Sequence, residues 1–359
     1  MNHIFVEAHT REEAMSQYIL PNISQMNTNF VITDRDGYIY GQTKGFFEEH
    51  GYGIQVFNLM DPENSLHFNP FHSVVDGARL VRGYTRFHKV AIEGPEKKHE
   101  AQPVAVQIQD RLIQGDGGVA GLTAMVETIL KSTDSKTGHS EQAVKHFEKY
   151  LLLALVLYVA EVYEKQERNL WKISELLESA ETLEARMCEL QNRNFASMAV
   201  RNYRNFQMGV EMVGKEHVVT SLRRRLQVID KDVLKELMPD SSIDFDAFGQ
   251  EKQVLFIIAP EGSEPVVAMI VQQLEERLRE YTERICNSYR LPVSVTMLLS
   301  IDYASLISDL NMRMATSRKY NIGYSLISYI SNAYMQGTKN EWEFLVNSCD
   351  NVLHLGSGD

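Results

Sequence analysis

The segment from Phe5 to Met15, FVEAHTREEAM, places carboxylates where phosphate chemistry would need the opposite charge. A strand-like run precedes it and a helix-like run follows it, and a phosphate-binding loop operates at this kind of junction. Such a loop offers backbone amides and a lysine, whereas this one carries Glu12 and Glu13. At roughly 4–6 Å and an effective dielectric near 20, one carboxylate repels one phosphate charge by roughly 3–4 kcal/mol. The residue types therefore argue against a conventional nucleotide site.

The same residues predict a helix that closes its own N-terminus. Thr10 and Glu13 have the spacing of a capping box, with Thr10 at the N-cap and Glu13 at the third helical position. The helix dipole also favours acidic side chains in a first turn. We favour this self-capping interpretation, with an unusual anion or nucleotide site as the alternative.

Strand and helix patterns alternate in the outer parts of the chain. Continuous apolar runs of this kind predict the central strands of a parallel sheet, with helices between them. Two of the runs end in carboxylates, Asp34 and Asp302. The strand-like runs are NFVITD (29–34), QVLFIIAP (253–260), LPVSVTMLLSID (291–302) and IGYSLISYI (322–330).

The middle of the chain shows only helical spacing, as in Phe147, Leu151, Leu155, Tyr158 and Val162. We therefore expect one α/β domain, with mostly parallel strands flanked by helices, that an all-α domain interrupts. The expected parts are 1–118, 119–240 and 241–359, the last being cut short at its C-terminus.

Composition limits the partners, the compartment and the membrane contacts that we expect. A net charge of −12 argues against nucleic acid coating the whole surface, because duplex binding needs clustered Lys and Arg. Cys188, Cys286 and Cys349 lack CxxC spacing, which predicts buried free thiols in a reducing compartment. The longest apolar run, 150–163, is shorter than the roughly 20 residues of a spanning helix, and no signal-peptide pattern opens the chain. We expect a soluble, cytoplasmic chain.

Six segments resemble, in order and spacing, those of the TraG/TraD-type coupling proteins of conjugative and type IV secretion systems. They cover almost the whole chain. The segments are YILPNISQMNTNFVITDRDGYIY (18–40), GYGIQVFNLMDPENSLHFNPF (51–71), HFEKYLLLALVLYVAEVYEKQERNL (146–170), LPVSVTMLLSIDYASL (291–306), TSRKYNIGYSLISYISNAYMQ (316–336) and NSCDNVLHLGSGD (347–359).

The resemblance implies a RecA-like P-loop NTPase-type domain, interrupted by an all-α domain, in a protein that is usually hexameric and membrane-anchored through N-terminal helices. Such proteins use ATP with Mg²⁺ and pass relaxase–DNA complexes or effector proteins to the secretion channel. It therefore implies secretion-system components and a transfer substrate as partners, and further copies of the chain as a possible homo-oligomer. The family's N-terminal helices are absent here, so this segment is expected to make no membrane contact.

Set in register with the family, the Walker A pattern loses every defining residue. The glycines of that pattern let amides cradle phosphates, its Lys reaches the β/γ-phosphates and its Ser or Thr binds Mg²⁺. Ala8 takes the first Gly, Glu13 the second, Ala14 the Lys and Met15 the Ser/Thr.

The Walker B strand shows a similar loss. Ile301 falls at the metal-binding Asp of the family and Asp302 at its Glu. A motor needs both carboxylates, one for Mg²⁺ and one to polarise water. We interpret Asp302 as a cap for the following helix, with catalysis as the alternative.

Three further sequence blocks match the family pattern only in part. Asp34 and Gly37 remain of the family's Asp-Pro-Lys-Gly-Glu block, while Ser328 and Asn332 stand in place of its glutamines. Arg318 matches an arginine of the family, with an interface or phosphate role and a surface salt bridge as alternatives. We predict no catalytic residue, no metal site and no nucleotide cofactor. The expected vestigial pocket consists of Thr10, Glu13, Ala14, Met15, Asp34, Asp302, Arg318 and Ser328.

Basic and histidine clusters lie in the helical part. The runs 201–204 (RNYR) and 223–225 (RRR) suit either an anionic partner or a solvated helix face, and we favour the solvated face. His139 and His146 are interpreted as surface residues, because no third metal ligand is evident.

The preferred hypothesis is a pseudo-ATPase of the coupling-protein family that acts in substrate docking or assembly. The competing hypothesis is an active translocation motor with an atypical nucleotide site, to which Lys44, Arg11 or Arg318 supplies the missing cation. A stand-alone protein-binding adaptor is the third.

Overall fold

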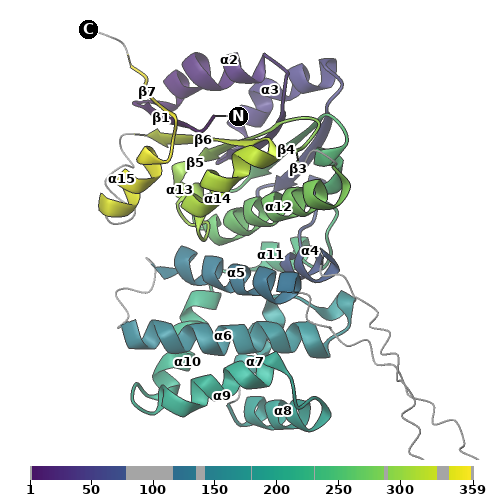
Figure 1. The fold of residues 1–359 in the computed structure, drawn as a ribbon, viewed down its shortest axis with the longest axis vertical. Coiled ribbons are helices and arrows are strands. Elements are labelled where there is room, and N and C mark those ends of the chain that lie inside the picture. Colours follow the sequence, from purple (N-terminus) through teal and green to yellow (C-terminus); the bar gives the residue numbers. More distant parts are fainter. Residues whose placement is uncertain are drawn as a thin grey trace, which may run out of the picture.

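The computed structural model describes residues 2–77, 116–134, 142–178, 180–229, 231–286, 290–329 and 339–356. Seven parallel strands form one sheet in the order β3-β4-β2-β5-β6-β1-β7 (Figure 1). The strands are β1 (Ile4–Ala8), β2 (Asn29–Asp34), β3 (Gly53–Asn58), β4 (Gln253–Ile258), β5 (Val295–Ser300), β6 (Ile322–Tyr329) and β7 (Asn351–His354).

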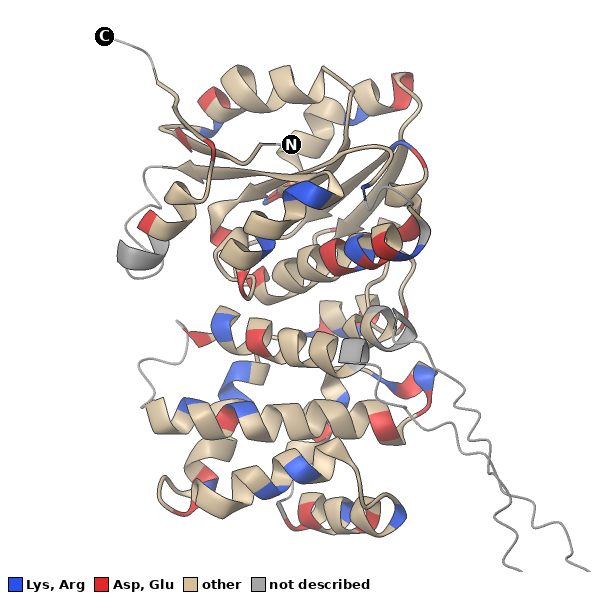
Figure 2. Cartoon of the chain, in the orientation of Figure 1, with Lys and Arg blue, Asp and Glu red and all other residues tan. Residues whose placement is uncertain are grey.

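Helices cover both faces of the sheet because its central strands are apolar on both sides. In β2, Phe30 and Ile32 belong to one buried cluster, whereas Val31 between them belongs to the other. The first cluster includes the helical segments after β1 and α3, and the second includes α12 and α14. Many of the charged residues of the chain lie on the helices around the sheet, as on α12 (Figure 2). The segments around the sheet are α1 (Arg11–Glu13), the π-helix η1 (Ala14–Ile19), α2 (Leu20–Ile23), α3 (Tyr38–Glu49), α4 (Pro70–Gly77), α12 (Glu264–Ile285), α13 (Ile301–Ala304), α14 (Leu310–Ser317) and α15 (Lys339–Asn347).

Between α4 and β4 the described residues contain helices and no strand. Helix α6 is the centre of this region: Leu151, Leu152 and Leu155 are fully buried, as expected for a core helix. The helices are α5 (Asp116–Ser132), α6 (Gln142–Val162), α7 (Trp171–Leu177), α8 (Ala180–Arg193), α9 (Met198–Val210), α10 (Lys215–Leu226) and α11 (Asp232–Leu237). Short 3₁₀ turns lie at Pro62–Asn64, Lys165–Glu167, Asp246–Gly249 and Arg318–Tyr320.

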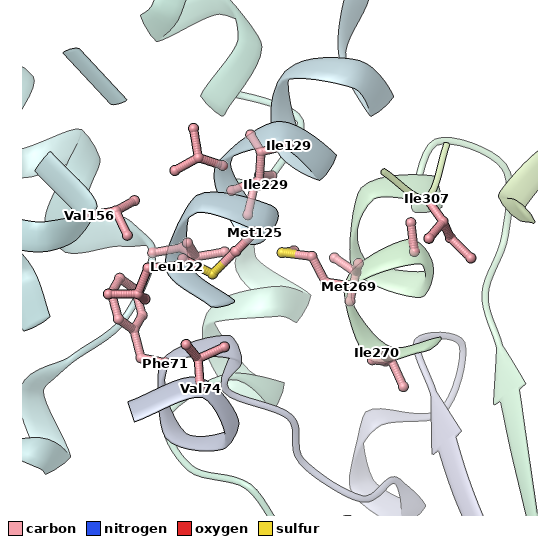
Figure 3. Close-up of a cluster of buried hydrophobic side chains, with 14 of the residues drawn as sticks. Phe71, Val74, Leu122, Met125, Ile129, Val156, Ile229, Met269, Ile270 and Ile307 are labelled. Carbon is pink, nitrogen blue, oxygen red and sulfur yellow. The ribbon is translucent and has the colours of Figure 1, made fainter. Parts of the chain in front are cut away.

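The helical region joins the sheet layers through α5, which packs on α12 (Figure 3). Met125 of α5 faces Met269 of α12, and Phe71 and Val74 of α4 border the contact. Since these residues are all buried, one continuous apolar core runs from the sheet into the helical region.

The run 223–225 is the solvated face that we predicted at two of its positions, but not at Arg225. Arg225 is buried and its Nε donates to both carboxylate oxygens of Glu148 at 3.0 Å. Arg223 donates to the carbonyl of Leu177, at the C-terminus of α7. Arg223 and Arg224 are both exposed, as expected. The error is physical: a buried carboxylate on α6 requires a cation, and nothing in the local run shows that α10 supplies it.

The predicted α/β layers and the helical interruption are confirmed, whereas the proposed domain limits stay a prediction. All three cysteines are free, as predicted, although Cys188 is exposed. Among the described residues, no helix has the length and apolarity needed to cross a bilayer.

Candidate functional site

The loop between β1 and α1 is closed by its own side chains. Thr10 Oγ1 accepts from Glu13 N at 3.2 Å, and Glu13 Oε2 accepts from Thr10 N at 3.2 Å and from His9 N at 3.1 Å. These reciprocal bonds confirm the predicted capping box. The amides of His9, Thr10 and Glu13 therefore already donate to oxygens of the same segment.

The two residues at the expected lysine and Ser/Thr positions lie in the core. Ala14 is 0% exposed and Met15 is 3% exposed, and both belong to the cluster that packs on the sheet with Tyr18 and Ile19. The chain here forms the π-helix Ala14–Ile19, which the sequence did not predict. Neither side chain is available to a ligand at the loop.

Arg11 connects the start of α1 to the end of β2. Its guanidinium donates to both oxygens of Asp36 at 2.6 Å and to Asp34 Oδ1 at 3.2 Å. It also lies 4.9 Å from the centre of the Tyr38 ring. Gly37 follows with φ +81°, a left-handed conformation that explains why glycine is kept there.

The carboxylates at this end of β2 have opposite pKa shifts. Burial raises the pKa of Asp34, although the Tyr40 amide and Arg11 oppose that effect. The hydrogen bonds from Arg11 lower the pKa of the more exposed Asp36. Arg11 therefore stabilises the ionised form of both groups.

After the end of β5, Asp302 pairs with Arg35, which directly follows the neighbouring strand β2. Arg35 Nη2 lies 3.0 Å from Asp302 Oδ2. Our interpretation of Asp302 as a helix cap is wrong: Ser300 occupies the N-cap position of α13 and Asp302 lies in the first turn. The neighbouring Tyr303 donates to the carbonyl of Ala259 at 2.6 Å, and burial raises its pKa to about 12.

Ser328 and Tyr329 complete the edge at the end of β6. Ser328 is 0% exposed, and its Oγ has no hydrogen-bond partner within the described part of the chain. Tyr329 pairs in register with Ala8, which places it beside the closed loop. Burial raises the pKa of Tyr329, and the charges of Arg11 and Asp302 both influence it.

We call Arg11, Asp34, Arg35, Asp36 and Asp302 together the carboxyl edge, because all five lie where β1, β2 and β5 end. Its two guanidinium groups are bonded to its three carboxylates. No group of three or more His, Cys, Asp or Glu could hold a metal ion anywhere in the described ranges.

A family model described as type IV secretory system conjugative DNA transfer matches residues 1–354. The chain belongs to this family. The resemblance found in the six sequence segments is thereby confirmed.

Solved structures share the fold of this family member at low identity. The bacterial conjugative coupling protein TrwBdeltaN70, in an unbound form, has a TM-score of 0.57 at 11% identity over 98% of this chain and 67% of that one. The plasmid coupling protein TrwB in complex with ADP and Mg²⁺ has 0.55 at 10%, over 98% and 69%. VirB4 of Thermoanaerobacter pseudethanolicus has 0.52 at 10%, over 99% and 78%. A search among curated proteins found no match.

These likenesses and the parallel sheet confirm the predicted RecA-like P-loop NTPase-type fold. In such an open parallel sheet, ligands bind outside the carboxyl ends of the strands. The carboxyl edge is therefore the candidate site of this family member.

Arg318 does not join the other seven predicted pocket residues. It precedes β6, at the opposite edge of the sheet, where its Nη2 lies 2.9 Å from Asp350 Oδ2. Of the alternatives stated for it, the structure shows the salt bridge. Asn332, the second expected glutamine equivalent, lies outside the described residues.

The other clusters singled out in this conjugative-transfer protein lie away from the carboxyl edge. Arg201 and Arg204 are exposed on α9, and His146 is exposed on α6 against Tyr150. His139 lies outside the described residues.

Sequence reasoning missed the partners that close the edge. Arg35 and Asp302 are 267 residues apart and meet only because β2 pairs with β5. Tyr329 could have been found from strand order alone, since β6 pairs with β1.

Proposed function

We propose that this member of the conjugative DNA-transfer family acts in substrate docking or assembly without turning over ATP. The observation that carries the proposal is the capping box, in which Thr10 and Glu13 use the amides that a phosphate would need. A phosphate would have to displace the Glu13 carboxylate and then lie beside its charge.

The residues of the carboxyl edge and those beside it do not fit a magnesium nucleotide. Ala14 and Met15 supply neither a cation nor a hydroxyl, and Ile301 supplies no metal ligand. Both arginines are held by carboxylates, so their charge is already neutralised. This contrasts with the related coupling protein that was solved with ADP and Mg²⁺.

The three cations named for the motor alternative each pair with a carboxylate of the described chain. Arg11 and Arg318 form ion pairs within the chain, and Lys44 lies 3.7 Å from Glu48 on the outside of α3. The adaptor alternative differs from the proposal only in lacking secretion-system partners. The proposal includes three kinds of partner. These are the secretion-system components, a transfer substrate (a relaxase, DNA or an effector protein) and further copies of the chain in a homo-oligomer.

Nucleotide binding is the direct test. The 359-residue chain is heated with and without millimolar ATP and Mg²⁺, and ATP hydrolysis is measured in parallel. A true site at a 100-fold excess of ligand over Kd would add roughly 2.7 kcal/mol of stability. We expect neither a thermal shift nor hydrolysis.

A matched pair of variants makes the result specific. Asp302→Ala changes the carboxyl edge, whereas Asp240→Ala changes a carboxylate whose partner is His67, away from that edge. Mg²⁺-dependent hydrolysis that Asp302→Ala abolishes and Asp240→Ala leaves intact would refute the proposal. Pull-down from cells carrying the secretion system then separates a coupling protein from an adaptor.

A further inference from the structure

Helix α9 and the turns at its two ends expose large apolar side chains more than any strand or helix around the sheet. Met208 is 86% exposed, Met212 is 92% exposed and Phe195, just before the helix, is 85% exposed. Arg201 and Arg204 are exposed on the same helix. We call these five residues the α9 face.

Helical geometry places the α9 face opposite the core. Positions 201, 204 and 208 follow one another at spacings of three and four, so they form a single stripe on α9, and Met212 lies in the turn that follows the helix. The core side of the helix carries Tyr203, Phe206 and Val210, all of them buried. The stripe therefore contributes nothing to the packing of α9 on α6.

The charge of this region is opposite to that of the chain. From Ala180 to Leu226 there are eight Lys and Arg and five Asp and Glu, in a chain of net charge −12. Neighbouring cations have partners, since Arg193 pairs with Glu189 and Lys215 with Glu184. Arg201 and Arg204 form no salt bridge within the described ranges, and α9 carries no carboxylate (Figure 2).

We propose that the α9 face binds an amphipathic helix of a partner protein that carries acidic and apolar side chains along one stripe. The exposed residues of α9 have the spacing of three and four that is found where two helices pack together. Carboxylates of the partner would pair with Arg201 and Arg204, and its apolar side chains would cover Met208 and Met212. Methionine suits such a surface because its flexible side chain adapts to its partner. This inference names the partner chemistry of the docking role and in that sense rests on the proposed function.

The arrangement fits a helix better than the other anionic surfaces. Phosphates would engage the two arginines but leave Phe195, Met208 and Met212 without partners. A membrane that buried Met208 would also meet the exposed Glu211, and amphipathic helices on membranes keep their cations on the polar face, away from the apolar one.

Photocrosslinking in cells that carry the secretion system tests the proposal. Met208 is replaced by p-benzoylphenylalanine, and cross-linked peptides are sequenced. We expect a segment with Asp or Glu and apolar residues at helical spacing. Arg201→Glu combined with Arg204→Glu should lower the yield at least tenfold, and Lys in place of the partner's acidic residues should restore it.

Matched controls come from the other half of the chain. Met312 of α14 is 68% exposed, so the same photocrosslinker at that position should not capture the segment. Arg284→Glu reverses an exposed charge on α12 and should leave the yield unchanged.

The remaining outcomes overturn the proposal. These are capture of no protein, capture of a segment without acidic residues, and capture that survives the double charge reversal. Charge-dependent flotation with phosphatidylglycerol vesicles, or cross-linking to nucleic acid alone, would assign the face to another anionic surface. None of these readouts depends on ATP, so a failure here is separable from a failure of the proposed function.

Discussion

The carboxyl edge and the α9 face each contain two arginines, and the two pairs differ in whether a carboxylate of the described chain binds them. At the edge, Arg11 and Arg35 are bonded to Asp34, Asp36 and Asp302. On the α9 face, no described carboxylate reaches either arginine, and exposed methionines lie in line with them. Polar groups that are satisfied within the chain stabilise it, whereas an unpaired, partly apolar surface marks a binding site. The arginines of the carboxyl edge are thus held within the chain, whereas those of the α9 face point to solvent.

The largest effect on stability should come from Arg225, whose ion pair with Glu148 is fully buried. Arg225→Ala leaves Glu148 buried without its cation, so we expect a loss of about 3–5 kcal/mol in the free energy of unfolding. Urea denaturation at constant m-value measures this loss. Arg225→Met with Glu148→Leu should recover most of it.

Arg225 also allows paired and unpaired arginines to be compared within one region, because it lies in the same helical region as Arg201 and Arg204. A loss below about 1 kcal/mol for Arg225→Ala would mean that burial and pairing do not separate the arginines of this chain in energy.

Reopening the carboxyl edge should cost stability without restoring nucleotide binding. Ala14→Lys places a long cation in a site that is 0% exposed, and we expect a loss of about 3 kcal/mol. Gln17→Lys, on the exposed side of the same π-helix, is the control and should change stability by less than about 0.5 kcal/mol. A stable Ala14→Lys variant that binds ATP would show that the edge is only one residue away from a working site.

Local patterns predicted the fold and the cap well, because both depend on neighbours in the sequence. The apolar run 29–34 became β2 within its expected limits, and Thr10 and Glu13 formed the expected capping box. Six ordered segments then placed the chain in its family.

Long-range pairing could not be predicted in the same way. Which carboxylate receives Arg35 or Arg225 depends on how β2 meets β5 and how α6 meets α10. Arg318 matched a family position, yet its place before β6 puts it at the other edge of the sheet. Spacing along the chain contains none of this information.

The amino edge of the sheet, opposite the carboxyl edge, should make stability depend on pH. His3 is buried, with Nε2 donating to the Met314 carbonyl at 2.8 Å and Nδ1 accepting from Tyr324 N at 3.2 Å. Burial lowers the pKa of His3; Arg318 and the amino terminus act in the same direction, and Asp350 opposes them.

Because the folded chain prefers neutral His3, its contribution to stability is complete above pH about 6.5 and is lost as the pH falls below that value. One proton limits the slope to about 1.4 kcal/mol per pH unit. His3→Gln should remove this part of the slope between pH 7 and 5, while His146→Gln, at an exposed site, should not. Equal slopes in all three proteins would contradict the assignment.

The cap itself should contribute about 1 kcal/mol. Thr10→Ala removes the acceptor for the Glu13 amide, and loss of an N-cap typically costs about 1 kcal/mol. Glu12→Ala, one residue before Glu13 and without a side-chain bond in the box, is the matched control. If Thr10→Ala also creates ATP binding, the capping box is the feature that excludes nucleotide from the carboxyl edge.

The smallest effect should be on the α9 face. Arg201→Glu with Arg204→Glu replaces two exposed cations that have no partner within the described chain, so we expect the free energy of unfolding to change by less than about 0.5 kcal/mol. Arg11→Glu, by contrast, removes three hydrogen bonds and sets three carboxylates together, and should destabilise the chain measurably. Thermal melts of both variants give the comparison. A destabilised α9 variant would mean that these arginines serve the fold, and the surface would then lose the feature that distinguishes it from the carboxyl edge.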